Sequence, residues 1–405
     1  MTTAPQRPIP GLAGAHDRRR TIAFLFAALS IGAMLASSSA LTPFYPPLEH
    51  SLDITPLGVS LVFAIYAVTL LAALLVAGSL SDHVGRRSVI SIGLVTLAVG
   101  ALTVSAVDTA PALFAARALQ GTASGLLTPA LSALLLDTAS PLRPGRGALL
   151  NAIMPGIGLA LGTLAGGAAL TLITPALPVT FRVLAGLYLA LAAVIWLLPE
   201  TSPRRTGSIR SLIPRVSIPR PVRRLFLIST PALIASWATG GLFLSLGPSI
   251  IAESLHTDNS FAQGAIVALL PAAGAVAVVA LRRLTPRAIA IIGTSSLAIG
   301  TAIALVALGA GSLLGYILAV VITGAGFGVS FYGVVGTLAP RSPVEERAGL
   351  FAAIYVTSYL SFGVPTVAAG FLASATSIPM TAAVYGILIT ALAATAAIAR
   401  IRASD

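Results

Sequence analysis

The stretch GSLSDHVGRR, residues 78–87, joins two long apolar segments, residues 57–80 and 88–107. Each segment is long enough to cross a bilayer, because about 20 mostly apolar residues form a helical span. The connection turns at Gly85, where a bulkier residue would strain a tight reversal. Two arginines follow directly, and clustered positive charge is typical of a cytoplasmic loop. The stretch therefore predicts two membrane-spanning helices that are connected on the cytoplasmic side.

The rest of the chain continues this pattern. Hydrophobic residues make up 57% of the 405 residues and charged residues 9%, whereas soluble domains carry about 25% charged residues. A soluble protein this poor in charge could not cover its surface, so lipid must form part of its surroundings. We therefore expect an all-α polytopic membrane protein with twelve transmembrane helices in two pseudo-repeated six-helix bundles. The predicted helices are residues 21–41, 57–80, 88–107, 111–136, 147–172, 181–198, 225–250, 261–281, 288–309, 312–338, 347–373 and 378–399.

The basic residues predict the orientation. There are 24, all arginine, and with twelve spans all except Arg117 and Arg182 fall on the side of the N-terminus. This asymmetry predicts that both termini lie in the cytoplasm. The expected location is a bacterial plasma (inner) membrane. Because the arginines form small clusters between apolar runs, they lack the continuous basic face of a nucleic-acid binder. The lipid bilayer is therefore an expected partner, and nucleic acid is not.

The predicted organisation has two bundles joined by a basic linker. A signal peptide is the alternative for the first apolar run, but its removal would leave an odd number of spans. A shift of 201 residues places Arg86 on Arg287 and Arg146 on Arg347, which suggests an internal duplication. Parallel halves of six helices describe one large transporter architecture. The expected segments are a cytoplasmic tail at 1–20, a bundle at 21–199, a linker at 200–224, a bundle at 225–400 and a tail at 401–405.

The loop at residues 78–87 resembles the signature G-x-L-x-D-x-x-G-R-R of the major facilitator superfamily. The resemblance implies a conformational latch, in which Asp82 meets the start of helix eleven near Arg347 and closes the cytoplasmic side in the outward-open state. The alternative is a simple topology signal, which would not require Asp82 or Gly78. The residues assigned to the latch are Gly78, Asp82, Gly85, Arg86, Arg87 and Arg347.

Helix four carries Arg117 and Gln120 in a segment that resembles the family motif R-x-x-Q-G. An arginine inside the membrane is energetically costly, so Arg117 is a candidate for the substrate or proton pathway. In the alternative interpretation its side chain reaches the outer membrane surface.

Helix five has glycines at 158, 162, 166 and 167 and resembles the exporter motif G-x-x-x-G-P-x-x-G-G, with Thr163 in place of proline. Small residues at every fourth position let another helix approach closely. The resemblance implies that Gly158, Gly162, Gly166 and Gly167 lie between helices five and eight, whereas the alternative is generic small-residue packing. The segment 198–201, which contains Glu200, ends helix six and is expected to be structural.

The remaining candidates are polar or aromatic residues of the predicted cavity helices. The chain has no cysteine, and its four histidines lie in the tail or in loops, so neither a metal site nor a cofactor is expected. Helix one carries no acidic residue in mid-membrane, so proton coupling would use edge positions such as Glu49, Asp53 and Glu253. The substrate or proton pathway is assigned to Ser37, Ser38, Tyr45, Arg117, Gln120, Asp137, Trp237 and Tyr332.

These observations predict a secondary active transporter of the drug/proton antiporter type and not an enzyme. It would act as a monomer and export small, largely hydrophobic organic compounds by alternating access in exchange for protons. One alternative is a proton-coupled importer of a sugar or another metabolite. A non-transporting membrane sensor is the alternative from a different class.

Overall fold

The computed structural model describes residues 10–140, 142–143, 145–204, 212 and 214–402, with side chains from residue 18 onward. Residues 1–9 of the expected tail, Arg205 and Arg210 of the linker, and residues 403–405 lie outside this part of the chain. The described residues contain twelve helices that are long and apolar enough to cross a membrane. This confirms the predicted fold class.

The twelve long helices divide equally between the two halves of the chain. Those of the first half are α1 (Pro10–Ala40), α3 (Pro56–Ala77), α5 (Arg86–Ser105), α6 (Ala110–Thr138), α7 (Arg146–Leu172) and α8 (Ala176–Val194). Those of the second half are α10 (Arg223–Ser245), α12 (Ser260–Leu281), α13 (Pro286–Gly309), α14 (Leu313–Leu338), α15 (Arg347–Ala375) and α16 (Ile378–Arg402). The shorter helices are η1 (Thr42–Phe44), α2 (Tyr45–Leu52), α4 (Ser81–Val84), η2 (Ile195–Leu197), η3 (Arg220–Val222), α11 (Gly247–Leu255) and η4 (Val344–Glu346).

Local sequence signals start several of these helices. The first turn of a helix has backbone N–H groups without intrahelical partners, and a polar side chain just before the helix can accept from one of them. Thr55 accepts from Gly58 N in this way, and Thr285 accepts from Ala288 N, each followed by a proline at the first helical position. Asn259 caps α12 and Ser312 caps α14 by the same kind of bond.

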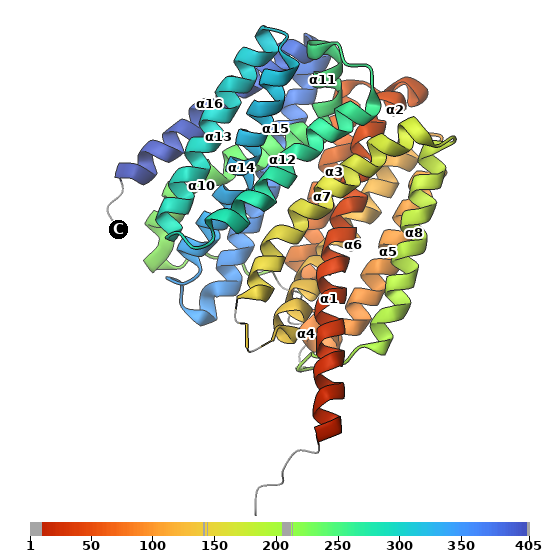
Figure 1. Ribbon diagram of the computed structural model, residues 1–405, viewed down its shortest axis with the longest axis vertical. Helices are drawn as coiled ribbons and strands as arrows, with labels where there is room; N and C mark the ends of the chain where they lie inside the picture. Colours follow the sequence, from red (N-terminus) through yellow and green to blue (C-terminus); the bar gives the residue numbers. More distant parts are fainter. Residues whose placement is uncertain (1–9, 141, 144, 205–211, 213, 403–405) are drawn as a thin grey trace, which may run out of the picture.

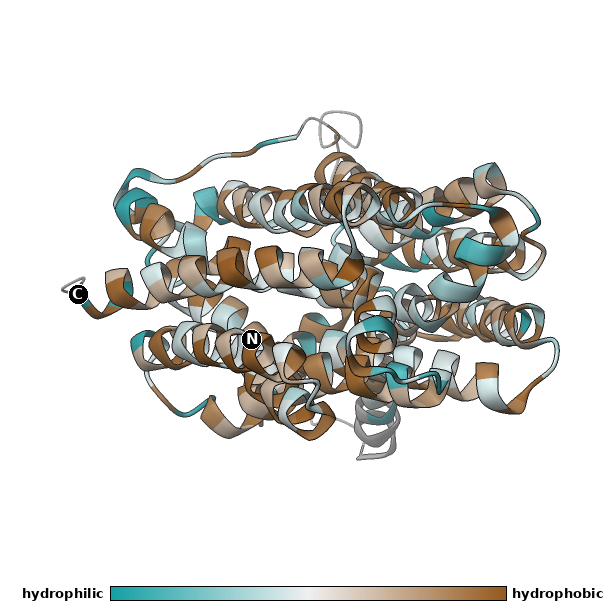
Figure 2. Cartoon of the chain, turned by 90° about the horizontal axis from the view of Figure 1, so that it is seen from above, coloured by the Kyte–Doolittle hydropathy of each residue, from teal (hydrophilic) through white to brown (hydrophobic). Residues whose placement is uncertain are grey.

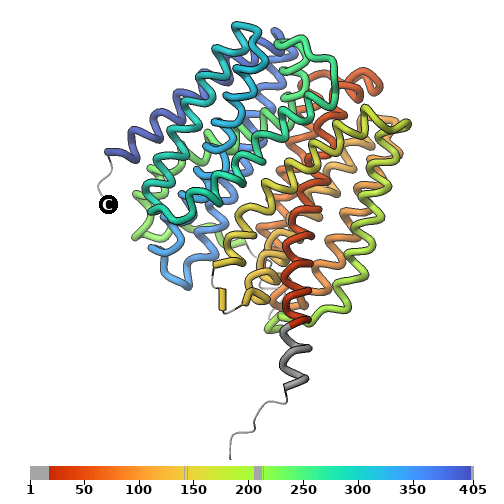
Figure 3. Tube along the Cα trace, in the orientation of Figure 1, coloured from red at the N-terminus to blue at the C-terminus, as the bar shows by residue number. Residues whose placement is uncertain are grey.

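The two halves form side-by-side bundles, red to yellow-green for the first and green to blue for the second (Figures 1 and 3). A similar bond joins the first and last long helices of each bundle. The Tyr188 hydroxyl donates to the Ala33 carbonyl, from helix six to helix one, and the Tyr385 hydroxyl donates to the Ala238 carbonyl, from helix twelve to helix seven. Both distances are 2.9 Å.

The outer surface of the bundles is suited to lipid. Large apolar side chains such as Leu29, Val68 and Leu187 are exposed along the helices. Apolar residues dominate the helices and hydrophilic residues gather at their ends and connections (Figure 2). With no polar solvent along its sides, such a helix satisfies its backbone groups internally.

The helix boundaries agree with expectation except at three places. The first helix begins at Pro10 rather than residue 21, so the second half of the expected tail is helical. The sixth predicted helix, 181–198, was placed too late, because α8 begins directly after Pro175. The seventh, 225–250, was too long, because Pro248 has no N–H to continue the helix and the chain turns at Leu246 into α11. Prolines likewise separate α2 from α1.

The bundles meet at the end that carries α2 and α11 and diverge toward the opposite end (Figure 1). At the α2–α11 end, the Thr42 hydroxyl donates to the Leu244 carbonyl at 2.9 Å, and Leu57 N–H donates to the Ser374 hydroxyl at 3.1 Å. Each of these bonds joins one bundle to the other. The opposite end carries α4, the linker and the end of α16, and we call it the arginine-rich end. The structure is therefore closed at the α2–α11 end.

Candidate functional site

An aromatic cluster lies between the two bundles. The ring of Trp237 on α10 lies 5.0 Å from that of Tyr359 and 5.7 Å from that of Phe362, both on α15, between ring centroids. Phe63 on α3 completes the contact between bundles, 4.7 Å from Phe362. Such aromatic pairs each contribute about 0.5–1.5 kcal/mol beyond the area that they bury. The cluster therefore gives the bundle interface an apolar, polarisable centre.

Several rings of this cluster are only half-buried. Trp237, Tyr355 and Tyr359 keep part of their surface accessible, although they lie on the inner faces of α10 and α15. Partly accessible aromatic rings can contact an apolar organic molecule. Trp237 was among the predicted pathway residues, whereas Tyr332 packs elsewhere, against Ile153 and its neighbours on α7, α12 and α13.

The sequence analysis missed the α3 and α15 members of this cluster. Their spacing was the available signal, since Tyr355, Tyr359 and Phe362 follow each other at i, i+4 and i+7 and therefore share one helix face. Phe63 and Tyr66 share a face of α3 in the same way.

Arg117 lies inside the first bundle, next to this interface. Its side chain is 0% exposed, so the alternative in which it reaches the membrane surface is wrong. Its Nη1 atom donates to the Gln120 side-chain oxygen at 2.9 Å and to the Ser38 carbonyl at 3.4 Å. The guanidinium carbon lies 4.4 Å from the centre of the Tyr66 ring, a cation–π contact. Tyr66 in turn packs against Tyr355 and Tyr359 of α15.

Two further predicted pathway residues lie close to Arg117 or to its contacts. Tyr45, at the start of α2, is 1% exposed and interacts electrostatically with the guanidinium. Ser37 is buried on α1, one residue before the carbonyl of Ser38 that Arg117 contacts. The structure thus brings Ser37, Ser38, Tyr45, Arg117 and Gln120 together, on α1, α2 and α6.

The loop at residues 78–87 is held by ion pairs within its own bundle. Arg86 forms an ion pair with Asp82 at 3.2 Å and a second with Asp137 at the end of α6. Asp137, predicted as a pathway residue, therefore lies in the loop network at the arginine-rich end. Arg347 Nε donates to the Ser342 carbonyl at 3.2 Å, and no ion pair joins Asp82 to Arg347 in the described part of the chain. The latch between them remains a prediction for another conformation.

Glu200 is a central member of this network and was expected only to have a structural role. Its carboxylate accepts from the backbone N–H groups of Arg86 at 3.0 Å and Arg87 at 3.3 Å, at the start of α5. It also accepts from the N–H groups of Thr201 and Ser202. A carboxylate at a helix N-terminus satisfies unpaired donors and complements the helix dipole. Gly85 makes this possible with a φ of 115°, and a Cβ there would lie 2.9 Å from the Glu200 carboxylate.

The glycines of α7 require a correction. The expected seam between helices five and eight does not contain three of them, because Gly158, Gly162 and Gly166 face α1. A Cβ at each position would lie 2.1–2.3 Å from a carbonyl oxygen of α1. Gly167 does face helix eight, since a Cβ there would lie 2.9 Å from the Ser260 carbonyl on α12. The three glycines share one face of α7 by their spacing, and only packing decides which neighbour approaches it.

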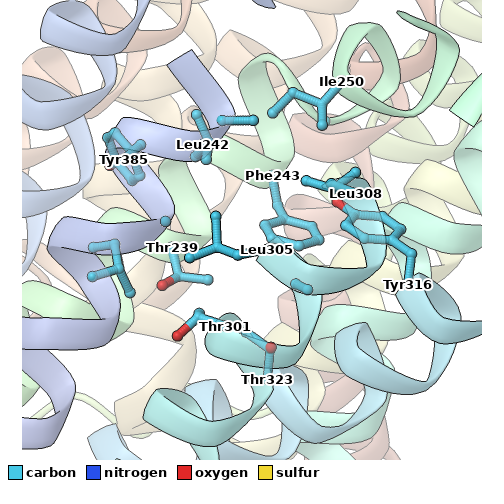
Figure 4. A pocket seen from close by; sticks show the side chains of 15 residues that line it. Thr239, Leu242, Phe243, Ile250, Thr301, Leu305, Leu308, Tyr316, Thr323 and Tyr385 are labelled. Carbon is cyan, nitrogen blue, oxygen red and sulfur yellow. The ribbon is translucent and has the colours of Figure 1, made fainter. Parts of the chain in front are cut away.

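A separate cavity lies within the second bundle, between α10, α13, α14 and α16 (Figure 4). Apolar side chains such as Leu305 and Phe243 line it together with the hydroxyls of Thr239, Thr301 and Thr323. Its volume of about 40 Å³ has room for only a few water molecules. It is distinct from the aromatic cluster at the bundle interface.

Comparison with known proteins agrees with this architecture. Two curated relatives from Mycobacterium tuberculosis, strains CDC 1551 / Oshkosh and ATCC 25618 / H37Rv, are each described as an uncharacterized MFS-type transporter EfpA. Each is 29% identical over 151 residues, which cover 36% of this chain and 28% of the relative. This chain therefore matches less than a third of their length.

Solved structures share the fold over nearly the whole chain. A bacterial homolog to the human lysosomal transporter Spinster, inward-facing and unoccupied, aligns with a TM-score of 0.73 at 13% identity, covering 95% of this chain and 97% of that one. The inward-facing, occupied form aligns with a TM-score of 0.72 at 12% identity, covering 94% and 96%. The Major Facilitator Superfamily model matches residues 27–364. With twelve apolar helices in two duplicated bundles, this chain belongs to the Major Facilitator Superfamily and is a membrane transporter, not an enzyme.

Proposed function

We propose that this transporter exports small, largely hydrophobic organic compounds by alternating access, in exchange for protons, as a drug/proton antiporter. The observation that carries the proposal is the aromatic cluster around Trp237, which lies between the bundles and has accessible rings. Apolar and aromatic linings are typical of sites for drug-sized organic molecules. Among the described residues, none of the three ion pairs involves a residue of this cluster.

The proposed location is a bacterial inner membrane, with both termini in the cytoplasm. The arginine-rich end would then face the cytoplasm. Because the bundles meet at the α2–α11 end and diverge at the other, this structure would then correspond to an inward-facing state (Figure 1). Reporters fused after Arg20, Arg215 and Arg402 should all lie in the cytoplasm, and one outside would contradict this orientation.

Two acidic side chains at the α2–α11 end are the proposed proton carriers. Glu49 lies on α2 and Glu253 on α11, and these short helices belong to different bundles and contact each other. Partial burial raises the pKa of Glu253 above its ordinary value, because loss of water disfavours the charged form. Burial thus favours the protonated form, so protons taken up from the outer side while the two helices are apart would stay bound when they close.

Transport in proteoliposomes tests the proposal. The purified protein is reconstituted, and a panel of hydrophobic dyes and of sugars is assayed with and without a pH gradient. Dye movement driven by the gradient, and lost in a Glu49→Gln, Glu253→Gln double variant, would support export by proton exchange. Gradient-driven accumulation of a sugar with no dye movement would establish the importer alternative. A protein that moves no compound in either direction would indicate the sensor.

Cells provide the test of direction. Cells that express the protein should accumulate less of a hydrophobic dye than cells that carry the empty vector. Greater accumulation in the expressing cells would contradict export.

A further inference from the structure

The guanidinium of Arg117 is a buried cation without an anionic partner. It is fully enclosed, and none of the ion pairs among the described residues includes it. Within the described part of the chain, its acceptors are the neutral oxygens of Gln120 and Ser38, and both accept from Nη1. Arginine keeps its charge in proteins, and a buried charge is costly unless it is paired. The surroundings of Arg117 therefore lack one negative group.

The unpaired atoms of Arg117 lie together on one edge. Nε and Nη2 are buried and have no hydrogen-bond partner among the residues that the structure describes. These two nitrogens occupy the same side of the planar guanidinium, where their parallel N–H bonds match the two oxygens of a carboxylate. Nη1, on the other side, is the atom that the protein itself satisfies. The open edge is thus the one with the geometry for a bidentate anion.

Neighbouring groups add further donors. Gln120 Nε2 and the hydroxyls of Tyr45 and Tyr66 are also buried, and no described residue forms a hydrogen bond with them. The amide nitrogen can only donate, and each hydroxyl can donate one hydrogen. A set of donors around a cation suits an anion and would not suit a second cation. Unlike a generic polar core, this group of side chains has an excess of donors over acceptors.

The route to the site passes Tyr66. Its ring covers the guanidinium on one side and packs against Tyr355 and Tyr359 on the other. Those rings belong to the aromatic cluster between the bundles. Rotation of Tyr66, or separation of α3 from α15, would bring the guanidinium within reach of a molecule that contacts the rings around Trp237. A molecule with an anionic head and an apolar body could then contact both.

We propose that Arg117, Gln120, Tyr45 and Tyr66 form a carboxylate-binding site, and that the transported substrates are hydrophobic organic carboxylates. This inference rests on the proposed transport function and narrows its substrate class. The carboxylate binds the Nε and Nη2 edge of Arg117, and the apolar body lies among the rings of α10 and α15.

A matched pair of probes tests the proposal. The purified full-length protein, in detergent and in chloride-free buffer at pH 7, is titrated by calorimetry with 1-naphthoate and with the uncharged 1-naphthamide. We expect naphthoate to bind about tenfold or more tightly, because charge-assisted bidentate bonds exceed neutral ones by at least that factor. Arg117→Met should reduce this ratio to about one, and Arg117→Lys should keep only part of it. Equal affinities of the two probes in the unmodified protein would overturn the proposal.

Controls separate binding from structure. Arg182→Gln removes an exposed arginine of the same bundle and should leave the ratio unchanged. Arg117→Met should melt no lower than the unmodified protein without ligand, because an apolar side chain replaces an unpaired buried charge. Naphthoate should raise the melting temperature of the unmodified protein and not of this variant. A ratio that survives in Arg117→Met, or a fall in its unliganded melting temperature, would assign Arg117 a structural role instead.

Two further measurements are needed. One distinguishes an inorganic anion from an organic carboxylate, and the other distinguishes failure of the carboxylate proposal from failure of the transport proposal. If sodium chloride binds with the same dependence on Arg117 and naphthoate shows no preference over naphthamide, the site holds an inorganic anion only and the substrate class is wrong. If proteoliposomes export neutral dyes equally with and without Arg117, the transport proposal stands and the carboxylate proposal fails. Carboxylate binding without transport of any compound would support the binding site and contradict the proposed transport function.

Discussion

At the scale of single residues, Glu200 shows how one carboxylate can organise a loop. It accepts four backbone N–H groups and lies 3.8 Å from Arg87 as an ion pair. The same position excludes any side chain at Gly85 without a shift of the carboxylate. Glycine is therefore required at position 85 of the signature loop for two reasons. It adopts a positive φ, and it leaves room for Glu200 at the end of helix six.

Replacement of Glu200 should weaken this end of the first bundle. Glu200→Gln keeps the shape but turns an NH₂ group toward backbone donors, so buried N–H groups lose their acceptor. We expect a loss of about 1–3 kcal/mol in stability, the usual cost of an unsatisfied buried donor. Thermal unfolding in detergent measures it, and Glu345→Gln, at an exposed glutamate, is the control. Equal melting temperatures for the two variants would show that the network contributes little.

At the scale of helices, α7 has two different neighbours. The face with Gly158, Gly162 and Gly166 packs on α1 within the first bundle, and Gly167 packs on α12 of the second bundle. Only the second contact changes if the two bundles move relative to each other as rigid units. The contact of the three α7 glycines with α1 therefore stabilises the first bundle, whereas the α7–α12 contact takes part in closure.

Substitutions on these two faces should have different effects. Overpacking of a tight interface costs about 1–3 kcal/mol. Gly162→Leu should lower the thermal stability, because α1 cannot leave its own bundle. Gly167→Leu should instead favour opening at the α2–α11 end, where the bundles can separate. Gly186→Leu, at a glycine with open space around it, is the control.

Distances between spin labels on the two bundles, at the α2–α11 end, distinguish these outcomes. If Gly162→Leu opened this end as much as Gly167→Leu does, the assignment of the two faces would be wrong.

At the scale of the whole molecule, the structure represents one side of a transport cycle. It is closed where α2 meets α11, and Asp82 pairs with Arg86 in its own bundle. In the opposite state the arginine-rich ends would approach, and Asp82 could then reach the start of α15. Transfer of one carboxylate between two partners would link this loop to the conformation.

Asp82→Asn should therefore shift the population toward the state described here. In this state Arg86 keeps Asp137 and the Thr201 hydroxyl as partners, so the variant loses less here than in the state that needs the latch. Because the chain has no cysteine, labels at Ser140→Cys and Glu345→Cys report the separation of the bundles at the arginine-rich end without interference. Asp258→Asn, at the opposite end, is the control. Unchanged distance distributions in Asp82→Asn would reduce the loop to a topology signal.

The sequence by itself determined the twelve spans and the family, because hydropathy and the signature loop are local properties of the chain. It also singled out Arg117 and Gln120 as members of one motif, and the structure shows that their side chains form a hydrogen bond. Boundaries failed where prolines break helices, as at Pro248. Local spacing can reveal such pairs but not which other helix lies opposite.

Only the tertiary structure decided which helices and side chains contact each other. It placed the glycine stripe against α1, set Glu200 at the start of α5, and gathered the rings of Trp237 and Tyr359 from different helices. A small residue indicates that another helix packs closely, and a buried charge indicates that a compensating group lies nearby. Neither identifies which helix or which group that is. The contact partner of each helix face depends on how all twelve helices pack together, because that packing must exclude lipid from the interior and satisfy the buried polar groups.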